Sequence, residues 1–279
     1  MDPLIHTISA WDGLKLSVLE WPGEPACVPL LCLPGLVRPG ADFEGLAAIR
    51  AGRNRIVAID YAGRGDSGRA EQVSRYAPEA CVRDILDVTA ALHLHHAVAI
   101  GTSFGGMLAM GIAMTRPGLL RGVVLNDIGP ELSADGDSFV RELVGHDPAL
   151  ESFDACIAYL KEPMPPLALE SDAAWRRAAA LTYGPGADGK FHPLWDTRIA
   201  RLLDAPRPDL WPLFGALAHL PLLLLRGEVS NILLSEAVTR MQALRPDMEV
   251  VEIPGVGHAP ILTEPQAVAA VERYLERVH

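Results

Sequence analysis

Residues 101–105 read Gly-Thr-Ser-Phe-Gly, a G-x-S-x-G pattern with Ser103 at its centre. A strand-like run, HAVAIG (96–101), precedes the serine, and a stretch with helical periodicity follows it at 104–116. At a sharp strand-to-helix turn, small residues on both sides let neighbouring backbone pass, and the hydroxyl is raised above the sheet edge at a helix N-terminus. The pattern therefore predicts that Ser103 is a nucleophile that attacks a carbonyl carbon.

A nucleophilic serine needs a base and an oxyanion site, and the chain has candidates for both. His258 lies in IPGVGHAPILTEP, a Gly-rich loop between the last strand-like run and the final helical segment. Loops at the carboxyl ends of parallel strands gather at one rim, so we expect His258 to meet Ser103 there. For the oxyanion hole we expect two backbone N–H groups. One belongs to Phe104, directly after the nucleophile, and the other to Leu36, in the Pro-Gly-Leu segment that follows an earlier strand-like run.

Short apolar runs alternate with helical patterns along most of the chain. LIHTISA and LKLSVLEW flank Trp11-Asp12-Gly13, a tight-turn signal, and predict an opening hairpin. The other strand-like runs are VPLLCL (28–33), RIVAID (55–60), HAVAIG (96–101), LRGVVLND (120–127), LPLLLL (220–225) and MEVVEIP (248–254). Helical periodicity is found at 41–52, 77–93, 104–116 and near 264–278. The alternation predicts the α/β class, with a mostly parallel, doubly wound eight-stranded sheet that is covered on both faces.

The alternation is interrupted in the middle of the chain. Residues 131–220 are helical and loop-like in pattern, with Pro-rich breaks at 163–166 and 205–212. Strand-like runs resume only after this stretch. We therefore expect a core domain made of residues 1–130 and 221–279, into which a helical cap of residues 131–220 is inserted.

The composition restricts the partners of the protein. The chain has 279 residues, is 49% hydrophobic and carries a net charge of −11, without clustered Lys and Arg, so nucleic acid is not an expected partner. The start, MDPLIHTISAWDG, has no leader pattern, and runs such as LPLLLL are too short to cross a bilayer. We expect a cytoplasmic protein without a membrane partner. The four cysteines have no zinc-like spacing, so we expect reduced thiols and no metal site, and a homodimer is left open.

Several segments together resemble α/β-hydrolases of the lid-bearing serine esterase and lactonase type, over nearly the whole chain. They are LCLPGL (31–36), DFEGLA (42–47), IDYAGRGDSGR (59–69), GTSFGG (101–106), LNDIGPE (125–131), LRGEVSNILL (225–234) and PGVGHAP (254–260). The resemblance implies a Ser-His-acid triad, no cofactor, and a helical cap between the sixth and seventh strands. It also implies that GRGDSG (63–68) is a structural turn. This segment fits the dinucleotide pattern G-x-G-x-x-G, but no helix opens directly on it.

The acid of the implied triad is left open by the sequence. Relatives usually place an Asp after the seventh strand, where this chain has Asn231, and an amide cannot offset the charge of an imidazolium. Asp127, at the end of the sixth strand-like run, occupies the second site that this fold offers for the acid. Glu228 is a third candidate. Three explanations remain: Asp127 replaces the missing acid, the chain is a weakened form of an Asp enzyme, or Glu228 serves.

The predicted cap holds nine of the chain's 16 aromatic residues. This enrichment favours a roomy apolar pocket for a hydrophobic small molecule, and Tyr159, Trp175 and Trp195 are the candidate substrate-binding residues. The alternative is that most of these rings form the cap's own small core. We expect a serine hydrolase that cleaves a carboxylic ester or lactone through an acyl-enzyme, with C–C bond hydrolysis as a variant. The other hypothesis, which Asn231 keeps open, is a weakly catalytic or non-catalytic binding protein on the same fold.

Overall fold

The computed structural model describes residues 2–161, 167–169, 171–205 and 208–278. Its centre is an eight-stranded sheet in the order β1-β2-β4-β3-β5-β6-β9-β10. The strands are β1 (Leu4–Ser9), β2 (Lys15–Trp21), β3 (Leu30–Leu33), β4 (Ile56–Ile59), β5 (Ala97–Thr102), β6 (Leu120–Asn126), β9 (Leu222–Gly227) and β10 (Glu249–Ile253). β2 is antiparallel to both β1 and β4, and the other neighbours are parallel. The predicted α/β class and mostly parallel sheet are confirmed.

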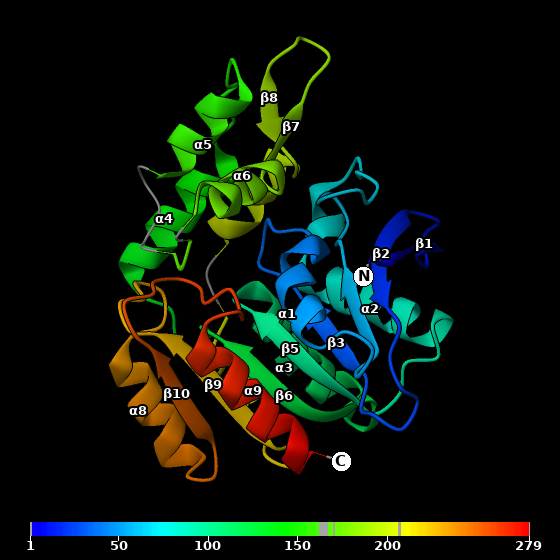
Figure 1. The fold of residues 1–279 in the computed structure, drawn as a ribbon, viewed down its shortest axis with the longest axis vertical. Coiled ribbons are helices and arrows are strands. Elements are labelled where there is room, and N and C mark those ends of the chain that lie inside the picture. The colour runs from blue at the N-terminus through cyan, green and yellow to red at the C-terminus, as the bar shows by residue number, and fades with distance from the viewer. Residues whose placement is uncertain (1, 162–166, 170, 206–207, 279) are drawn as a thin grey trace.

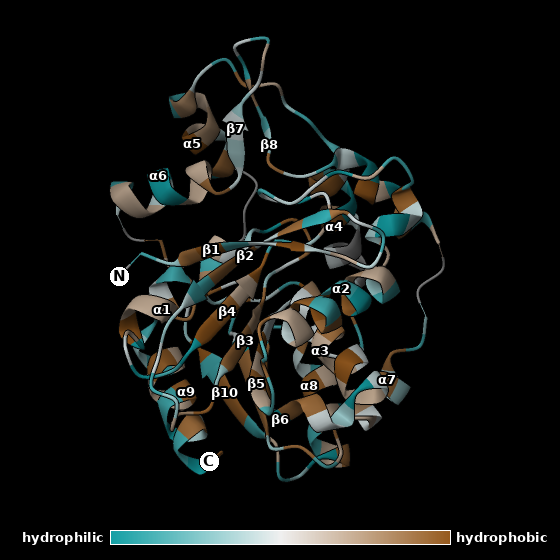
Figure 2. Cartoon of the chain, turned by 90° about the vertical axis from the view of Figure 1, so that its right-hand side faces the viewer, coloured by the Kyte–Doolittle hydropathy of each residue, from teal (hydrophilic) through white to brown (hydrophobic). Residues whose placement is uncertain are grey.

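Helices cover both faces of this sheet, as Figure 2 shows. One face packs against α2 (Pro78–Ala91), α3 (Phe104–Thr115), α7 (Trp211–Gly215) and α8 (Ser235–Leu244), and the other against α1 (Glu44–Ile49) and α9 (Pro265–Arg277). In β3, Leu31 and Leu33 join the first apolar layer, whereas Leu30 and Cys32 join the second, because successive side chains point to opposite faces. Burial on both faces explains why the parallel strands have almost continuous apolar sequences.

The carboxyl ends of the parallel strands bring distant loops to one rim of the sheet. Residues 34–36 follow β3, Ser103 follows β5, Asp127 follows β6, residues 228–231 follow β9, and His258 lies in the loop after β10. The parallel pairing of β6 with both β5 and β9 places their loops side by side. The loops that carry the candidate residues therefore lie together at this rim, as the sequence predicts.

Most of the insertion between β6 and β9 stands over this rim, at the top of Figure 1. It contains α4 (Ala134–Gly145), α5 (Phe153–Lys161), α6 (Asp172–Ala180), β7 (Tyr183–Pro185), β8 (Phe191–Pro193), the 3-10 helix η4 (Thr197–Asp204) and α7. The insertion is not helical throughout, because β7 and β8 form an antiparallel hairpin. The turn between them includes Gly189, whose φ is 82°, a conformation that glycine adopts without steric cost.

The last helix of the insertion, α7, packs against the sheet, and we use the word cap for the part of the insertion from α4 to η4. Phe214 of α7 is buried in the same apolar cluster as Leu108 of α3. The Pro-rich break predicted at 163–166 lies outside the described residues. Among the helices that the structure describes, none has both the length and the apolar character needed to cross a bilayer.

Candidate active site

Ser103 occupies a strained turn between β5 and α3. Its φ of 52° and ψ of −119° lie in a region that residues with a Cβ rarely adopt. The flanking glycines are needed for steric reasons. A Cβ on Gly105 would lie 1.9 Å from the carbonyl oxygen of Leu33, and a Cβ on Gly101 would lie 2.5 Å from the carbonyl carbon of Gly105. The tight turn places the Ser103 hydroxyl at the N-terminus of α3, where the helix dipole favours negative charge.

His258 lies between Ser103 and Asp127. Its Nε2 is 2.9 Å from Ser103 Oγ, and its Nδ1 is 2.7 Å from Asp127 Oδ2. The Asp127 side chain is fully buried, whereas that of His258 is 14% exposed. A carboxylate on Nδ1 favours the tautomer with a proton on that nitrogen, so Nε2 is left as the acceptor for the serine proton. The three side chains thus have the arrangement that an activated serine requires.

The end of β9 and the loop after it hold the Asp127 carboxylate. The N–H of Gly227 donates to Oδ1 at 3.0 Å, and the Ser230 hydroxyl donates to Oδ2 at 2.6 Å. Ser230 Oγ in turn accepts hydrogen bonds from the N–H groups of Ile232 and Leu233, both at 3.2 Å. Each carboxylate oxygen therefore has a donor besides the histidine. The sequence analysis missed Ser230, whose only signal is that it precedes Asn231 in the loop where an acid was expected.

The other two candidates for the acid have different contacts. Glu228 Oε2 accepts a hydrogen bond from the N–H of Gly255 at 2.7 Å and is exposed. Asn231 Oδ1 is buried without a hydrogen-bond partner among the described residues. The backbone carbonyl of Asn231 accepts a hydrogen bond from Ser133 at the start of α4. Of the three candidates, Asp127 is the one whose carboxylate contacts His258.

The predicted oxyanion donors, Leu36 and Phe104, both line the cavity beside Ser103. Phe104 is the first residue of α3, and its ring lies edge-on against Tyr61 with 5.8 Å between centroids. The loop that carries Leu36 is anchored by the Tyr61 hydroxyl, which donates to the carbonyl of Pro34 at 3.2 Å. Tyr61 therefore contacts both segments that are expected to supply the oxyanion donors.

A cavity of about 1180 Å³ extends from Ser103 and His258 into the space between core and cap. Apolar side chains form most of its wall. They come from the core and from the cap, and include Met107, Ile128, Phe139, Val140, Trp175 and Leu181. Trp175 is thus placed where the sequence analysis expected it. The aliphatic wall residues were not singled out, because in sequence they do not differ from ordinary core residues.

Tyr159 and Trp195 lie outside the cavity, contrary to the expectation that they contact substrate. Trp195 is 2% exposed, and its Nε1 donates to the carbonyl of Val144 at 2.9 Å inside the base of the cap. Tyr159 packs against Tyr183 in the cap's own apolar cluster, with 6.2 Å between ring centroids. For Tyr159 the alternative interpretation, a small cap core, describes the structure, whereas Trp195 belongs to the large apolar cluster that also contains Leu108 of α3.

The arginines that line the cavity are paired with carboxylates. Arg38 donates through Nε and Nη2 to both oxygens of Asp42, at 2.7 and 2.6 Å, and through Nη1 to Thr182 Oγ1 in the cap at 2.6 Å. Arg177 of α6 forms an ion pair with Glu44 of α1. These contacts join the cap to the core at the cavity, and they neutralise both guanidinium groups.

Comparisons with known proteins agree with this architecture. A family model described as the alpha/beta hydrolase family matches residues 30–271. The chain is 31% identical to the 3-hydroxybutyrate-oligomer hydrolase of Cupriavidus necator, over 97% of this chain and 96% of that protein. It is 29% identical to the 2-(acetamidomethylene)succinate hydrolase of Mesorhizobium japonicum, over 82% of this chain and 81% of that protein.

Structural similarity extends over the cap as well as the core. The crystal structure of an α/β hydrolase from Novosphingobium aromaticivorans matches with a TM-score of 0.92 and 38% identity, and the match covers 99% of both chains. The order of strands, the turn at Ser103 and these matches lead to one conclusion. The chain belongs to the α/β-hydrolase family and is a hydrolase.

Proposed function

We propose that this hydrolase cleaves carboxylic esters with Ser103 as nucleophile, His258 as general base and acid, and Asp127 as the triad acid. The observation that carries the proposal is the position of His258, which is 2.9 Å from the serine hydroxyl and 2.7 Å from a buried carboxylate. A carboxylate in this position fixes the histidine tautomer and stabilises the imidazolium that forms during the reaction. The family assignment favours this enzyme over the binding-protein hypothesis.

The reaction proceeds in two halves. Ser103 Oγ attacks the ester carbonyl while His258 Nε2 takes the hydroxyl proton, and the N–H groups of Leu36 and Phe104 stabilise the oxyanion. As the tetrahedral intermediate collapses, the ester C–O bond breaks and His258 gives the proton to the departing alcohol. Ser103 then carries the acyl group. Water then attacks the acyl-serine with His258 as base, and the acid and the free serine are released.

Esters of hydroxyalkanoic acids are our first candidate substrates, and short hydroxybutyrate oligomers come first among them. One relative, 31% identical over nearly the full length, is named a 3-hydroxybutyrate-oligomer hydrolase. Such oligomers are uncharged along the chain and alternate ester groups with short apolar segments. A large, mostly apolar cavity whose arginines are already paired suits a substrate of that kind.

A substrate panel tests the proposal. It compares methyl esters of hydroxybutyrate dimers and trimers with para-nitrophenyl acyl esters, lactones and vinylogous diketones, and we expect the highest kcat/KM for the hydroxybutyrate esters. A lactone or a diketone as the best substrate would overturn the substrate assignment alone. In parallel, a fluorophosphonate probe should label Ser103, and Ser103→Ala should abolish labelling and turnover. Turnover by Ser103→Ala at the wild-type rate would overturn the mechanism.

A further inference from the structure

Arg64 is a buried cation without a carboxylate partner among the described residues. It is 0% exposed. Its Nη1 donates to the carbonyl of Ala62 at 2.8 Å and its Nε to the carbonyl of Leu36 at 2.8 Å. Its Nη2 is buried and has no partner at hydrogen-bond geometry in the described part of the chain, and the guanidinium interacts electrostatically with the nearby Cys81 thiol. Burial of a charge without a carboxylate partner costs free energy of folding, which indicates that Arg64 has a role other than stabilising the fold.

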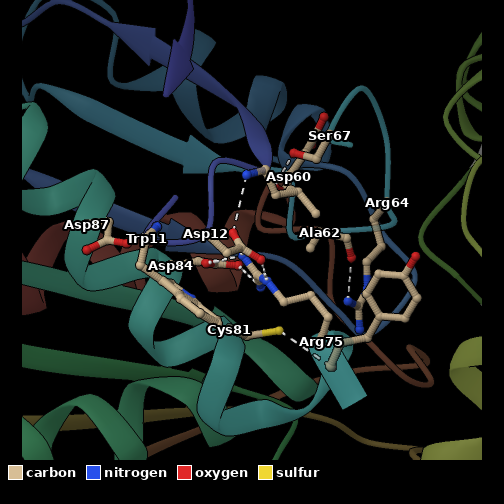
Figure 3. Close-up of polar contacts among 12 residues, drawn as sticks. Trp11, Asp12, Asp60, Ala62, Arg64, Ser67, Arg75, Cys81, Asp84 and Asp87 are labelled. Atoms are coloured by element: carbon tan, nitrogen blue, oxygen red, sulfur yellow. Dashed lines mark hydrogen bonds and ion pairs between the residues drawn. The ribbon is translucent and has the colours of Figure 1, made fainter. Parts of the chain in front are cut away.

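A neighbouring arginine, Arg75, is paired with carboxylates, as buried arginines usually are. Arg75 lies between the carboxylates of Asp12 and Asp84, as Figure 3 shows, and its nitrogens contact both at distances from 2.6 to 3.2 Å. In the same view a dashed line joins Arg64 to the carbonyl of Ala62. Aromatic rings surround the Arg64 guanidinium: its central carbon lies 5.7 to 5.8 Å from the ring centroids of Tyr61, Tyr76 and Phe104. Ring faces attract a cation, but they do not neutralise it.

Arg64 contacts both residues that are expected to supply the oxyanion donors, Leu36 and Phe104. Its Nε holds the carbonyl of Leu36, and its guanidinium lies against the ring of Phe104. The backbone of Arg64 is fixed by the base of the cap, because residue 64 pairs with Trp195 and the N–H of Gly65 donates to the carbonyl of Leu194 at 2.9 Å. The Arg64 guanidinium therefore connects the loop of Leu36 with the start of α3 at Phe104, the two segments that are expected to supply the N–H groups.

We propose that Arg64 is a positioning residue of the oxyanion hole, an inference that rests on the proposed serine mechanism. Its guanidinium fork sets the conformation of the Leu36 loop and the position of Phe104. Its unpaired charge adds a positive potential near the site where the oxyanion develops. In a buried, weakly screened environment such a charge acts over several ångströms. An ion pair with a carboxylate would cancel that potential, which accounts for the unpaired state of this arginine.

Two substitutions test the inference. Arg64→Met removes the charge and the fork but keeps an unbranched side chain, and Arg64→Lys keeps the charge but cannot donate in the same fork. With para-nitrophenyl butyrate, we expect kcat to fall about 100-fold in Arg64→Met and about 10-fold in Arg64→Lys, while KM changes less than about three-fold. A structural role alone would not give this separation of kcat from KM.

A control uses a buried arginine at the other end of the sheet, Arg245, which unlike Arg64 is paired with a carboxylate, that of Asp247, at 2.9 and 2.7 Å. Arg245 is also buried, and it donates to the carbonyls of Leu217 and Leu220 at 2.6 and 2.9 Å. Arg245→Met should lower the thermal unfolding midpoint and leave kcat at the wild-type value. Near-UV circular dichroism establishes which variants are folded, and if Arg64→Met does not fold, Arg64→Lys decides the test.

Phenylboronic acid, which forms a tetrahedral anion on an active serine, provides a direct readout of the oxyanion hole. We expect its inhibition constant to rise in parallel with the loss of kcat in the Arg64 variants. A folded Arg64 variant with wild-type kcat, or with reduced kcat but unchanged boronate affinity, would overturn the inference. Failure of both variants to fold would assign Arg64 a purely structural role and overturn it too. If wild-type protein is neither labelled by a fluorophosphonate nor active on esters, the proposed function itself fails.

Discussion

Ser230, in the loop after β9, donates its hydroxyl hydrogen to Oδ2 of Asp127, which follows β6, at 2.6 Å. The two strands pair in parallel, with Asn126 opposite Leu225, so their carboxyl ends are adjacent. The loop that lacks a carboxylate at Asn231 thus contributes a hydrogen-bond donor to the carboxylate that follows the neighbouring strand. This relationship explains how the acid can come from β6 while the β9 loop still takes part in the site.

The first prediction concerns the two positions that could supply the acid, Asp127 and Asn231. Asp127→Asn keeps the shape of the side chain but stabilises the wrong histidine tautomer, so we expect kcat/KM to fall about a thousand-fold or more. Asn231→Asp should change kcat/KM by less than about ten-fold, because Asp127 already holds Nδ1 of His258. Steady-state kinetics on one ester measures both. A large gain of activity in Asn231→Asp would instead identify a weakened enzyme whose acid belongs at position 231.

The second prediction concerns the support of the acid. Ser230→Ala removes one donor to Asp127 and leaves the N–H groups of Ile232 and Leu233 without their acceptor. We expect kcat to fall about ten-fold and the free energy of unfolding to fall by about 1–3 kcal/mol. Ser235→Ala, at an exposed position on α8, is the control and should change neither. Wild-type kcat in Ser230→Ala would show that Gly227 and His258 hold the carboxylate without help.

The third prediction separates two tryptophans of the cap. Trp175 lines the cavity, so Trp175→Ala should change the relative kcat/KM values among short and long acyl esters more than it changes stability. Trp195 is buried and outside the cavity, so Trp195→Ala should lower the free energy of unfolding by about 3–5 kcal/mol. Urea unfolding and an ester series measure the two effects. Equal selectivity in wild type and Trp175→Ala would place Trp175 among the residues that only stabilise the cap.

The fourth prediction concerns the junction between cap and core. Burial of the Asp196 carboxyl raises its pKa, but hydrogen bonds from Arg198 and Tyr76 outweigh this effect and lower the pKa to about 2 from an ordinary 3.8. Because the folded-state pKa is depressed, the stabilisation is fully present above pH 3.8 and is lost as the pH falls towards 2.

Urea unfolding of wild type and Asp196→Asn at several pH values measures this linkage. We expect the variant to be less stable by on the order of 2 kcal/mol near neutral pH, and the difference to shrink below about pH 4. Glu276→Gln, at an exposed position of α9, should show no such pH-dependent difference. A deficit in Asp196→Asn that stays constant down to about pH 2.5 would rule out the ionised carboxylate as its source.

The sequence alone determined the fold class, the turn at Ser103 and the place of His258 in the chain. These features depend on local patterns. Strands buried on both faces require continuous apolar runs, and the approach of Gly105 to the carbonyl of Leu33, where a Cβ would lie 1.9 Å away, permits only glycine at that position. Such constraints act within a few residues or on a whole element, so they remain visible in a single sequence.

The tertiary structure alone decided the features that depend on contacts between distant residues. Asp127 meets His258 across 131 positions of sequence, and only the side-by-side ends of β6 and β9 show why Asn231 is not in that place. The aromatic enrichment of the cap could not separate Trp175 from Trp195, because apolar patterning marks a side chain for burial without indicating whether it faces a cavity or a core. Arg64 stood in a turn interpreted as purely structural, and its unpaired charge became apparent only once the rings and carbonyls around it were in place.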